Sequence, residues 1–399
     1  MVGAVLACGD APSFTIGSIE FAGPAGSGEP SLYATSDGRA ILTWHEPEGE
    51  GYALRVAERR AGEWSEPKTV ATGLEFFVNW ADFPSLIERG DGAWVVHWLE
   101  RTTPKPYAYH VKLAVSTNRG DTWSEPVVPH GDRSPTEHGF VSMVPWNDGG
   151  VAIIWLDGRQ MVTGRRERGN GNDRAGSERG AMSLRFTIVS SDGTPGEDVL
   201  LDDRTCECCQ TALVRTAGGL VAAYRDRAED ELRNIAVVGM RDGVWSQPMP
   251  VNDDGWRIRG CPVNGPQLSA RGDNVVIAWF TAPEHRPRVN VAFSGDGGAT
   301  FGPPSPVDDG NPAGRVDVEM LEDGSAVVVW LERKAGDAEI RARVVHPDGG
   351  RRPSWRVTAT GAGRAAGFPR MARAGNELLF AWTDPSAKGG VRVVAARGP

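Results

Sequence analysis

A short apolar segment that ends in an aromatic residue recurs along the whole chain. Three copies end at Trp44, Trp155 and Trp330, and the other copies end at Trp98, Tyr224, Trp279 and Trp382. Successive aromatic positions lie 54, 57, 69, 55, 51 and 52 residues apart. Each segment is short, rich in β-branched residues and preceded by Gly, Asp or Asn, which predicts a β-strand.

Other strand-like segments surround each copy. In the second unit, residues 83–87 precede it, residues 111–115 follow it, and Trp123-Ser-Glu-Pro comes after a turn. Four antiparallel strands in a unit of this length are typical of a β-propeller blade. No helical periodicity competes with this pattern. The repeated aromatic residues are therefore expected in the cores of the blades.

The last unit ends after its third strand, and the apolar segment of residues 14–21 can supply the missing outer strand. Closing the ring removes exposed strand edges. We therefore predict an all-β chain: a single β-propeller of four-stranded antiparallel blades over residues 14–399, closed by the N-terminal strand. Seven blades are preferred, with six as the alternative.

The N-terminal segment has a composition of its own. Cys8 lies in Val-Leu-Ala-Cys-Gly, which resembles a bacterial lipobox, where Cys8 would be lipidated. Seven residues precede Cys8 and none is Lys or Arg, so a signal n-region is missing. Residues 1–13 are accordingly interpreted either as the remnant of a lipoprotein signal or as a tail with one free thiol. The first interpretation predicts an exported protein, periplasmic or at the cell surface.

Charge and hydropathy limit the partners. The chain has 43 Lys and Arg against 52 Asp and Glu, a net charge of −9, which argues against nucleic acid as a partner. No run of eighteen apolar residues occurs, so membrane contact is expected only through a lipid anchor. We predict a monomer.

Four further cysteines fall in two neighbouring segments: Cys206, Cys208 and Cys209 open the fourth unit, and Cys261 opens the fifth. In an exported protein an even set favours disulfides, and a bridge from Cys261 would join the two units. In a reducing compartment the same thiols favour zinc or copper(I). Disulfides are the preferred interpretation and no cofactor is expected, with copper or zinc as the alternative.

Two turns carry a family resemblance. Residues 116–123 read Ser-Thr-Asn-Arg-Gly-Asp-Thr-Trp, and residues 294–301 read Ser-Gly-Asp-Gly-Gly-Ala-Thr-Phe. Both resemble the Asp-boxes of sialidase-like (BNR-repeat) propellers, where Asp and Gly build a tight turn between the third and fourth strands of a blade. The second copy keeps Asp296, whereas Asn118 replaces it in the first. The resemblance extends over residues 14–399 and implies the propeller fold.

The resemblance also implies a chemistry. Sialidases use an Arg-Ile-Pro motif in the first blade, three arginines for the substrate carboxylate, a Tyr nucleophile paired with Glu, and an Asp acid/base. Here the first blade opens with Gly28-Glu29-Pro30, so the opening arginine is absent. The candidate catalytic residues are Asp82, Glu137, Asp226 and Tyr224.

Other candidates come from the links that lead into each inner strand and those that follow each second strand, because in a propeller these share one face around the axis. Arginines alternate there with carboxylates and suit a carboxylate, sulfate or phosphate on a ligand. The alternative is that Arg–Asp pairs lock neighbouring blades. The candidate ligand-binding residues are Asn79, Trp80, His138, Arg159, Arg225, Arg227, Arg259, Asn264, Arg315 and Arg370.

The third unit carries a Gly-rich, charged insertion between Arg159 and Met182. Its length and composition predict a mobile flap on the ligand face, or else a solvated loop without a partner.

Three functions remain open. The first is a glycoside hydrolase, sialidase-like or acting on another acidic sugar, that binds an acidic glycan or other anionic ligand at the axial face. The second is a non-catalytic propeller that binds a glycan or a protein at the cell surface. The third is a thiol or metal function built on the four clustered cysteines.

Overall fold

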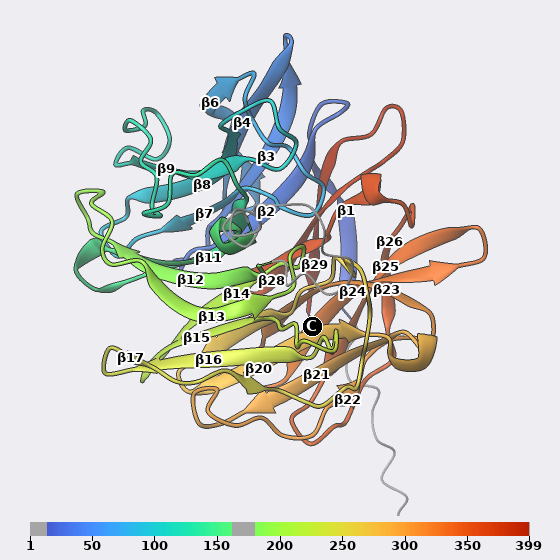
Figure 1. Cartoon of the computed structure of the whole chain (residues 1–399). Helices are drawn as coiled ribbons and strands as arrows, with labels where there is room; N and C mark the ends of the chain where they lie inside the picture. The colour runs from blue at the N-terminus through green and yellow to red at the C-terminus, as the bar shows by residue number, and fades with distance from the viewer. Residues whose placement is uncertain (1–13, 162–179, 399) are drawn as a thin grey trace, which may run out of the picture.

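Seven antiparallel sheets follow one another around a ring in the computed structural model, which describes residues 14–161 and 180–398 (Figure 1). The prediction of a seven-bladed, all-β propeller is therefore confirmed. Cys8, the tail of residues 1–13 and most of the charged insertion, residues 162–179, lie outside the described residues. Within the described part of the chain, no helix has the length and apolar character needed to cross a membrane.

The first three blades are built as follows. Blade 1 contains β2 (Gly28–Ala34), β3 (Ala40–Glu48), β4 (Gly51–Arg60) and a split outer strand, β5 (Glu63–Trp64) with β6 (Lys68–Gly73). Blade 2 contains β7 (Ser85–Glu88), β8 (Trp94–Arg101) and β9 (Tyr109–Ser116), and its outer strand is reduced to a bridge between Leu113 and Val127. Blade 3 contains β10 (His138–Pro145), β11 (Val151–Asp157), β12 (Met182–Val189) and β13 (Val199–Thr205).

The other four blades repeat this plan. Blade 4 contains β14 (Ala212–Thr216), β15 (Gly219–Arg225), β16 (Ile235–Arg241), β17 (Val244–Trp245) and β18 (Met249–Pro250). Blade 5 contains β19 (Gln267–Arg271), β20 (Asn274–Thr281), β21 (Arg288–Ser294) and β22 (Ser305–Pro306). Blade 6 contains β23 (Pro312–Met320), β24 (Ala326–Lys334), β25 (Asp337–Val345) and β26 (Trp355–Thr360). Blade 7 contains β27 (Arg370–Ala374), β28 (Glu377–Thr383), β29 (Val391–Arg397) and β1 (Thr15–Ala22). The described residues also include three short 3-10 helices between strands: η1 (Asn147–Gly149), η2 (Pro283–His285) and η3 (Arg364–Ala366).

The N-terminal strand closes the ring, as predicted. β1 pairs antiparallel with β29, with Thr15 opposite Arg397 and Ala22 opposite Arg392. Figure 1 shows the blue strand β1 beside the red strands of the C-terminal blade. Phe14 extends the closure, because its ring stacks on Trp355 of the neighbouring blade at 5.3 Å between centroids.

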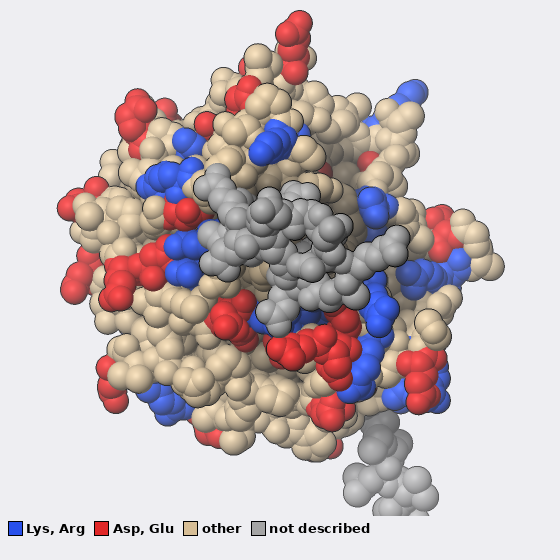
Figure 2. All heavy atoms as spheres, viewed as in Figure 1, with Lys and Arg blue, Asp and Glu red and all other residues tan. Residues whose placement is uncertain are grey.

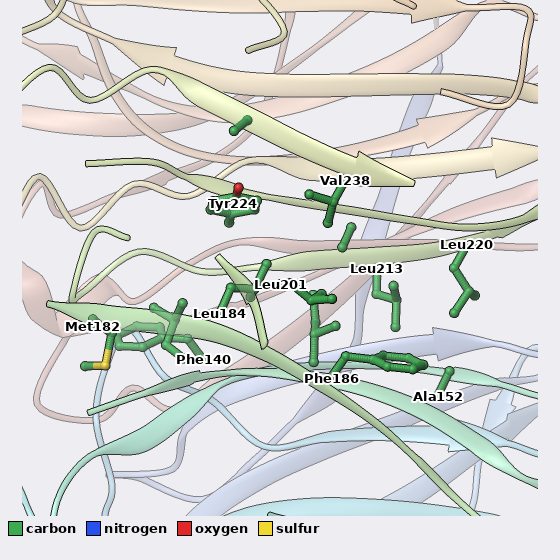
Figure 3. Packing of buried hydrophobic residues seen from close by; sticks show 14 of the residues in the cluster. Phe140, Ala152, Met182, Leu184, Phe186, Leu201, Leu213, Leu220, Tyr224 and Val238 are labelled. Carbon is green, nitrogen blue, oxygen red and sulfur yellow. The ribbon is translucent and has the colours of Figure 1, made fainter. Parts of the chain in front are cut away.

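The apolar positions of the repeat form the interfaces between blades. The described residues contain seven hydrophobic clusters, one for each pair of neighbouring blades. Trp44, Trp155, Trp279 and Trp330 are 0% exposed. Figure 3 shows the cluster between blades 3 and 4, where Phe186 of β12 and Leu220 of β15 contribute to the same interface. Each large apolar side chain buried in this way contributes about 1.5–3 kcal/mol.

The charge that follows the core aromatic has a structural reason. The indole N–H of Trp44 donates to Glu46 at 3.0 Å, that of Trp155 to Asp157 at 2.9 Å and that of Trp330 to Glu332 at 2.7 Å. A buried indole N–H needs an acceptor, and a carboxylate two residues later supplies it. Part of the charge seen after the second strands therefore belongs to the blade cores.

The two turns that resemble Asp-boxes have the same hydrogen bonds. Ser116 Oγ donates to Asn118 at 2.9 Å, and Ser294 Oγ donates to Asp296 at 2.7 Å. In each turn the Asn or Asp side chain also accepts the backbone N–H of a threonine four residues later, at 2.9 Å. Asn118 thus accepts the same two hydrogen bonds as the aspartate in the second turn.

Candidate functional site

The inner strands of all seven blades surround an axial cavity of about 190 Å³. Its polar lining includes Ser31, Asp82, Ser85, Ser142, Gln210, Thr211, Gln267, Asp317, Glu319 and Arg370. We call the face where the links into the inner strands meet the axial face. Figure 2 shows acidic and basic side chains gathered around the middle of the face toward the viewer.

The links into the inner strands are bent in a repeated way. Glu29, Phe140, Val263 and Arg315 have φ between 49° and 56°, the left-handed region that non-glycine residues rarely adopt. The pairing of β2 with β3, β10 with β11 and β23 with β24 shifts register at or beside these positions. A bulge of this kind turns side chains away from the pleat, and it directs this ring of links toward the axis.

Polar side chains on one link hold the next blade in place. Asp82 accepts the backbone N–H of Phe140 at 2.9 Å, and Asn264 accepts that of Arg315 at 2.6 Å. In the same way Gln210 accepts from Gly265 at 3.0 Å and Asp317 from Met371 at 2.9 Å. Each contact satisfies a buried backbone N–H of the next blade. Asp82 and Asn264, two predicted site residues, therefore join blades as well as lying at the axial face.

Two carboxyl groups lie together where blade 2 meets blade 3. Burial, with a smaller contribution from the neighbouring carboxylate of Glu137, raises the pKa of Asp82 to about 7. Burial likewise raises the pKa of Glu137 to about 7. The Tyr109 hydroxyl lies 3.4 Å from Glu137 Oε2, and its ring stacks on Phe77. Because both carboxyls sit in a poorly hydrated place, either can carry a proton near neutral pH. We call Asp82 and Glu137 the acid pair. Tyr109 is the tyrosine beside it.

The link of residues 77–83 also carries an aromatic residue that reaches blades 6 and 7. Trp80 stacks on Phe368 at 5.7 Å, and the Arg315 guanidinium lies 4.8 Å from the centre of the Trp80 ring. Arg364 approaches the same ring at 5.9 Å. Trp80 is half-buried, so part of the ring remains in contact with solvent.

Arg315 is a buried cation without a carboxylate partner among the described residues. Its side chain donates to the carbonyl oxygens of Gly363 and Gly367, both at 2.9 Å. Burial lowers the pKa of Arg315 to about 10, with a contribution from the positive charge of Arg333. The group therefore stays protonated at neutral pH and keeps its charge uncompensated.

Arg370 leaves hydrogen-bond donors unused. Its guanidinium lies 4.9 Å from the Phe83 ring, and its Nε lies 3.3 Å from Asp317 Oδ2. The Nε and Nη1 groups are buried, and neither has a hydrogen-bond partner among the described residues. The contact with Asp317 is thus an ion pair by distance without hydrogen-bond geometry. We call Trp80, Arg315, Arg364, Phe368 and Arg370 the cationic sector.

The arginines of blades 3 to 5 meet a different environment. Arg159 pairs with Asp157 at 2.6 Å and with Asp198 at 2.7 Å. Arg227 pairs with Glu231 at 2.8 Å and also with Glu207. These guanidinium groups are neutralised within the protein.

Arg225 is 1% exposed and forms a latch between blades 4 and 5. Its guanidinium donates to the carbonyl oxygens of Asn264, Arg233 and Phe280 at 2.5–3.0 Å and lies over the Trp256 ring at 4.9 Å. No solvent-facing donor remains for a ligand in this conformation. Arg259, by contrast, is exposed and has no partner among the described residues.

The remaining candidate residues are placed as follows. Tyr224 lies in the core between blades 3 and 4 (Figure 3), and its hydroxyl donates to Asp202 at 2.5 Å. Burial raises the pKa of Asp226 to about 6. The Asn79 side chain accepts the backbone N–H of Ala81 at 2.9 Å and shapes the link that carries Trp80. The structure does not gather Tyr224 with the acid pair as a hydrogen-bonded unit.

His138 belongs to a histidine cluster in blades 2 and 3. Its ring stacks on that of His130 at 3.9 Å, and its Nε2 lies 3.0 Å from Asp132. Asp132, His138 and Asp157 present ligand atoms within 4.8 Å of one another. Asp157 already forms an ion pair with Arg159, so in this structure its carboxylate is engaged within the protein.

The four cysteines of the described chain are free thiols. Cys206 Sγ lies 3.3 Å from Cys209 Sγ and 3.9 Å from Cys208 Sγ. The disulfides expected from the sequence are thus not present in this structure. The two cysteine-bearing links are neighbours, because Cys261 lies near enough to Cys208 to affect its pKa, but Cys261 is outside the group of three sulfur atoms that lie within 4.8 Å of one another.

Several residues of the axial face were missed from the sequence. Tyr109 begins a third strand, Arg364 and Phe368 lie in the Gly-rich link between β26 and β27, and Glu29 stands beside the position of the arginine that the sialidase motif would have. Burial raises the pKa of Glu29 to about 7, and its carboxylate lies 3.8 Å from His45. A signal existed for Tyr109, because tyrosine is rare here, with five in the chain.

The comparisons with known proteins support the fold. No family model matches the chain, and no curated protein matches it by sequence. A protein of unknown function from Dyadobacter fermentans is 14% identical, with 96% of this chain and 97% of that chain covered and a TM-score of 0.54. A PL25 ulvan lyase, solved with a bound -[GlcA(1-4)Rha3S]- unit, is 12% identical, with 94% of both chains covered and a TM-score of 0.60. The NanB sialidase of Streptococcus pneumoniae is 12% identical, with 98% and 69% covered and a TM-score of 0.46. At these identities the first two matches show a shared propeller fold.

Proposed function

We propose that the protein binds an acidic glycan at its axial face and cleaves it by acid–base catalysis. One observation carries the proposal: the link of residues 77–83 joins the cationic sector, through Trp80, to the acid pair, through Asp82. An anionic sugar held by the first group would therefore lie next to protonatable carboxyls of the second.

The cationic sector suits recognition of a negatively charged sugar. Among the described residues, Arg315 is buried without a carboxylate partner, and Arg370 has N–H groups without acceptors. A carboxylate or sulfate would satisfy both, since guanidinium groups bind such anions through paired hydrogen bonds. The half-buried ring of Trp80 offers an apolar face for the sugar. The ulvan lyase with the same fold is solved with a unit that contains GlcA and Rha3S, which is consistent with this ligand class.

The acid pair suits proton transfer. When two neighbouring carboxyls have pKa values near 7, ionising one raises the pKa of the other, so the pair can hold one proton. We assign Glu137 as the general acid or base, because it is less buried than Asp82, which is 3% exposed and also latches blade 3. Tyr109 is a positioning residue, since its hydroxyl lies against the Glu137 carboxyl.

The test is an assay of the full chain against sialosides and uronate-containing or sulfated polysaccharides. Elimination would be detected by the ultraviolet absorbance of an unsaturated uronate, and hydrolysis by a new reducing end without that absorbance. We expect Glu137→Gln to lower turnover about 100-fold or more while leaving binding intact. Arg315→Met is expected to weaken binding at least about tenfold.

Arg356→Met is the matched control, because Arg356 lies on the outer strand β26 away from the axial face. Full turnover in Glu137→Gln would rule out its assignment. Binding without turnover in the unaltered protein would instead favour a non-catalytic glycan-binding propeller. Absence of both, across the panel, would overturn the proposal.

A further inference from the structure

A cluster of sulfur atoms lies in the link from blade 3 into blade 4. Cys206 and Cys209 are buried and Cys208 is half-buried. The three sulfur atoms lie within 4.8 Å of one another, and Cys206 directly follows β13. The backbone N–H of Cys206 donates to Arg225 O at 2.9 Å, so the start of the link is tied to the end of β15.

The surroundings of the cluster are cationic. Arg233 Nη1 lies 3.0 Å from Cys206 Sγ, an approach that favours a thiolate as acceptor, since a neutral thiol sulfur accepts weakly. The Arg233 side chain also pairs with Glu231 at 2.7 Å, which fixes its direction. The positive charge of Arg225 is near as well.

The spacing of the sulfurs fits metal ligands. Two thiolates bound to one zinc ion at about 2.3 Å in tetrahedral geometry lie about 3.8 Å apart. The observed separations of 3.3 and 3.9 Å lie near that value, and a disulfide requires about 2.05 Å. The three sulfurs therefore already stand close to the positions in which they would share one ion.

We propose that Cys206, Cys208, Cys209 and Cys261 form a thiolate site for one soft or borderline metal ion, Zn²⁺ or Cu⁺. The first three ligands come from the link into blade 4. Cys261 is exposed and lies outside this group of three sulfur atoms, and it would supply the fourth ligand from the neighbouring link into blade 5. The ion would cross-link the two blades, and its binding would release the thiol protons.

The arrangement also bears on which ion binds. Four thiolates complete a tetrahedral zinc site, whereas three thiolates suffice for Cu⁺. Cys261→Ser should therefore weaken Zn²⁺ binding at least about tenfold and leave Cu⁺ binding close to that of the parent. Zn²⁺ binding that is unchanged in Cys261→Ser would overturn the assignment of Cys261 as a ligand.

The experiment uses the full chain carrying Cys8→Ser, so that only the four clustered thiols are counted. The reduced protein is titrated anaerobically with Zn²⁺ or Co²⁺ and, separately, with Cu⁺ against a chromogenic chelator. We expect one ion per chain, sulfur-to-cobalt charge-transfer absorption, and a rise in melting temperature on binding. Cys206→Ser and Cys209→Ser are expected to abolish uptake.

Arg233→Met tests the site without removing a cysteine. It therefore keeps the proposal testable if a cysteine variant fails to fold. It is expected to weaken metal binding, since it removes the charged donor beside Cys206. Ser246→Ala, on the outer edge of blade 4, should bind as the parent does. Uptake that persists in Cys206→Ser would overturn the proposal. So would native protein whose four thiols become reactive only after reduction and then bind no ion, because this result identifies two disulfides.

Discussion

Two sectors of the axial face carry arginines, and they differ in what the guanidinium groups meet. In blades 3 to 5, Arg159 and Arg227 pair with carboxylates, and Arg225 donates to backbone carbonyls of the next blade. In the cationic sector, Arg315 also donates only to backbone carbonyls, but its guanidinium lies against the half-buried Trp80 ring, and Arg370 has donors without a partner among the described residues. Burial is common to Arg225 and Arg315, so burial alone does not separate a latch from a ligand site.

The difference teaches how to interpret charge in a propeller of this kind. An arginine whose donors are all satisfied by the protein stabilises the contact between blades, and removing it leaves buried acceptors without donors. An arginine with buried donors that the protein leaves without acceptors makes the empty site less stable, and an anion that accepts from those donors would be bound favourably. Substituting an arginine of the first kind should lower the stability of the protein, whereas substituting one of the second kind should lower its affinity for the ligand.

The largest effect is expected for the latch. Arg225→Met leaves the carbonyl oxygens of Asn264, Arg233 and Phe280 without their donor and should lower the free energy of unfolding by about 3 kcal/mol or more. The measurement is urea unfolding followed by tryptophan fluorescence. Arg356→Met, on an outer strand, is the control and should change stability by less than about 0.5 kcal/mol. A loss below about 1 kcal/mol for Arg225→Met would remove the distinction between the sectors.

The next effect is a pH dependence of stability from the acid pair. The folded state raises the pKa of Asp82 from 3.8 to about 7, so its protonated form is favoured on folding. The free energy cost of burying Asp82 is therefore smallest below about pH 4. The free energy of unfolding should fall by on the order of 2–4 kcal/mol as pH rises from about 4 to 7. Asp82→Asn, which keeps an acceptor for Phe140, should flatten this part of the curve.

Asp296 is the matched control with the opposite sign. Hydrogen bonds from Thr300 lower its pKa to about 2, so it stabilises the fold above about pH 4 and loses this contribution as pH falls toward 2. Asp296→Asn should therefore alter the curve only on the acid side. An unchanged slope between pH 4 and 7 in Asp82→Asn would contradict the buried-carboxyl assignment.

A smaller effect compares two arginines in ligand binding. Arg370→Met should weaken binding of an acidic glycan about tenfold, because it removes donors that only a ligand can satisfy. Arg227→Met should leave affinity within about twofold, since its guanidinium already serves Glu231 and Glu207. Titration calorimetry with one oligosaccharide measures both. Equal losses in the two variants would place the ligand across both sectors.

The sequence predicted the ring far better than the roles of its arginines. The repeated apolar segments and the terminal strand are local patterns, and each has the same meaning in every blade. The role of Arg225 depends on Asn264 and Phe280, which lie in the next blade and share no sequence signal with it. Arg225 and Arg315 therefore look alike in the sequence.

Other parts of the site escaped prediction for similar reasons. Tyr109 joins Glu137 because β9 begins beside the link into blade 3, a neighbourhood that exists only in the closed ring. The cysteine spacing predicted that the two links are near but left disulfide and metal open. The choice between a disulfide and a metal site depends on the distances between the sulfur atoms and on Arg233, which belongs to no recognisable sequence motif.

The smallest effect concerns Arg259, which sharpens the comparison because it is unpaired yet exposed. Water already solvates the guanidinium of Arg259, so an anion gains little by replacing that water. Only a screened long-range attraction between Arg259 and the anion remains. Arg259→Met should change stability by less than about 0.5 kcal/mol and weaken glycan binding at most about threefold at low salt, with no difference at high salt. Measuring both affinities at two ionic strengths checks this. A tenfold loss that persists at high salt would mean that Arg259 contacts the ligand directly, and then exposure, rather than unsatisfied burial, would be the better guide to the binding surface.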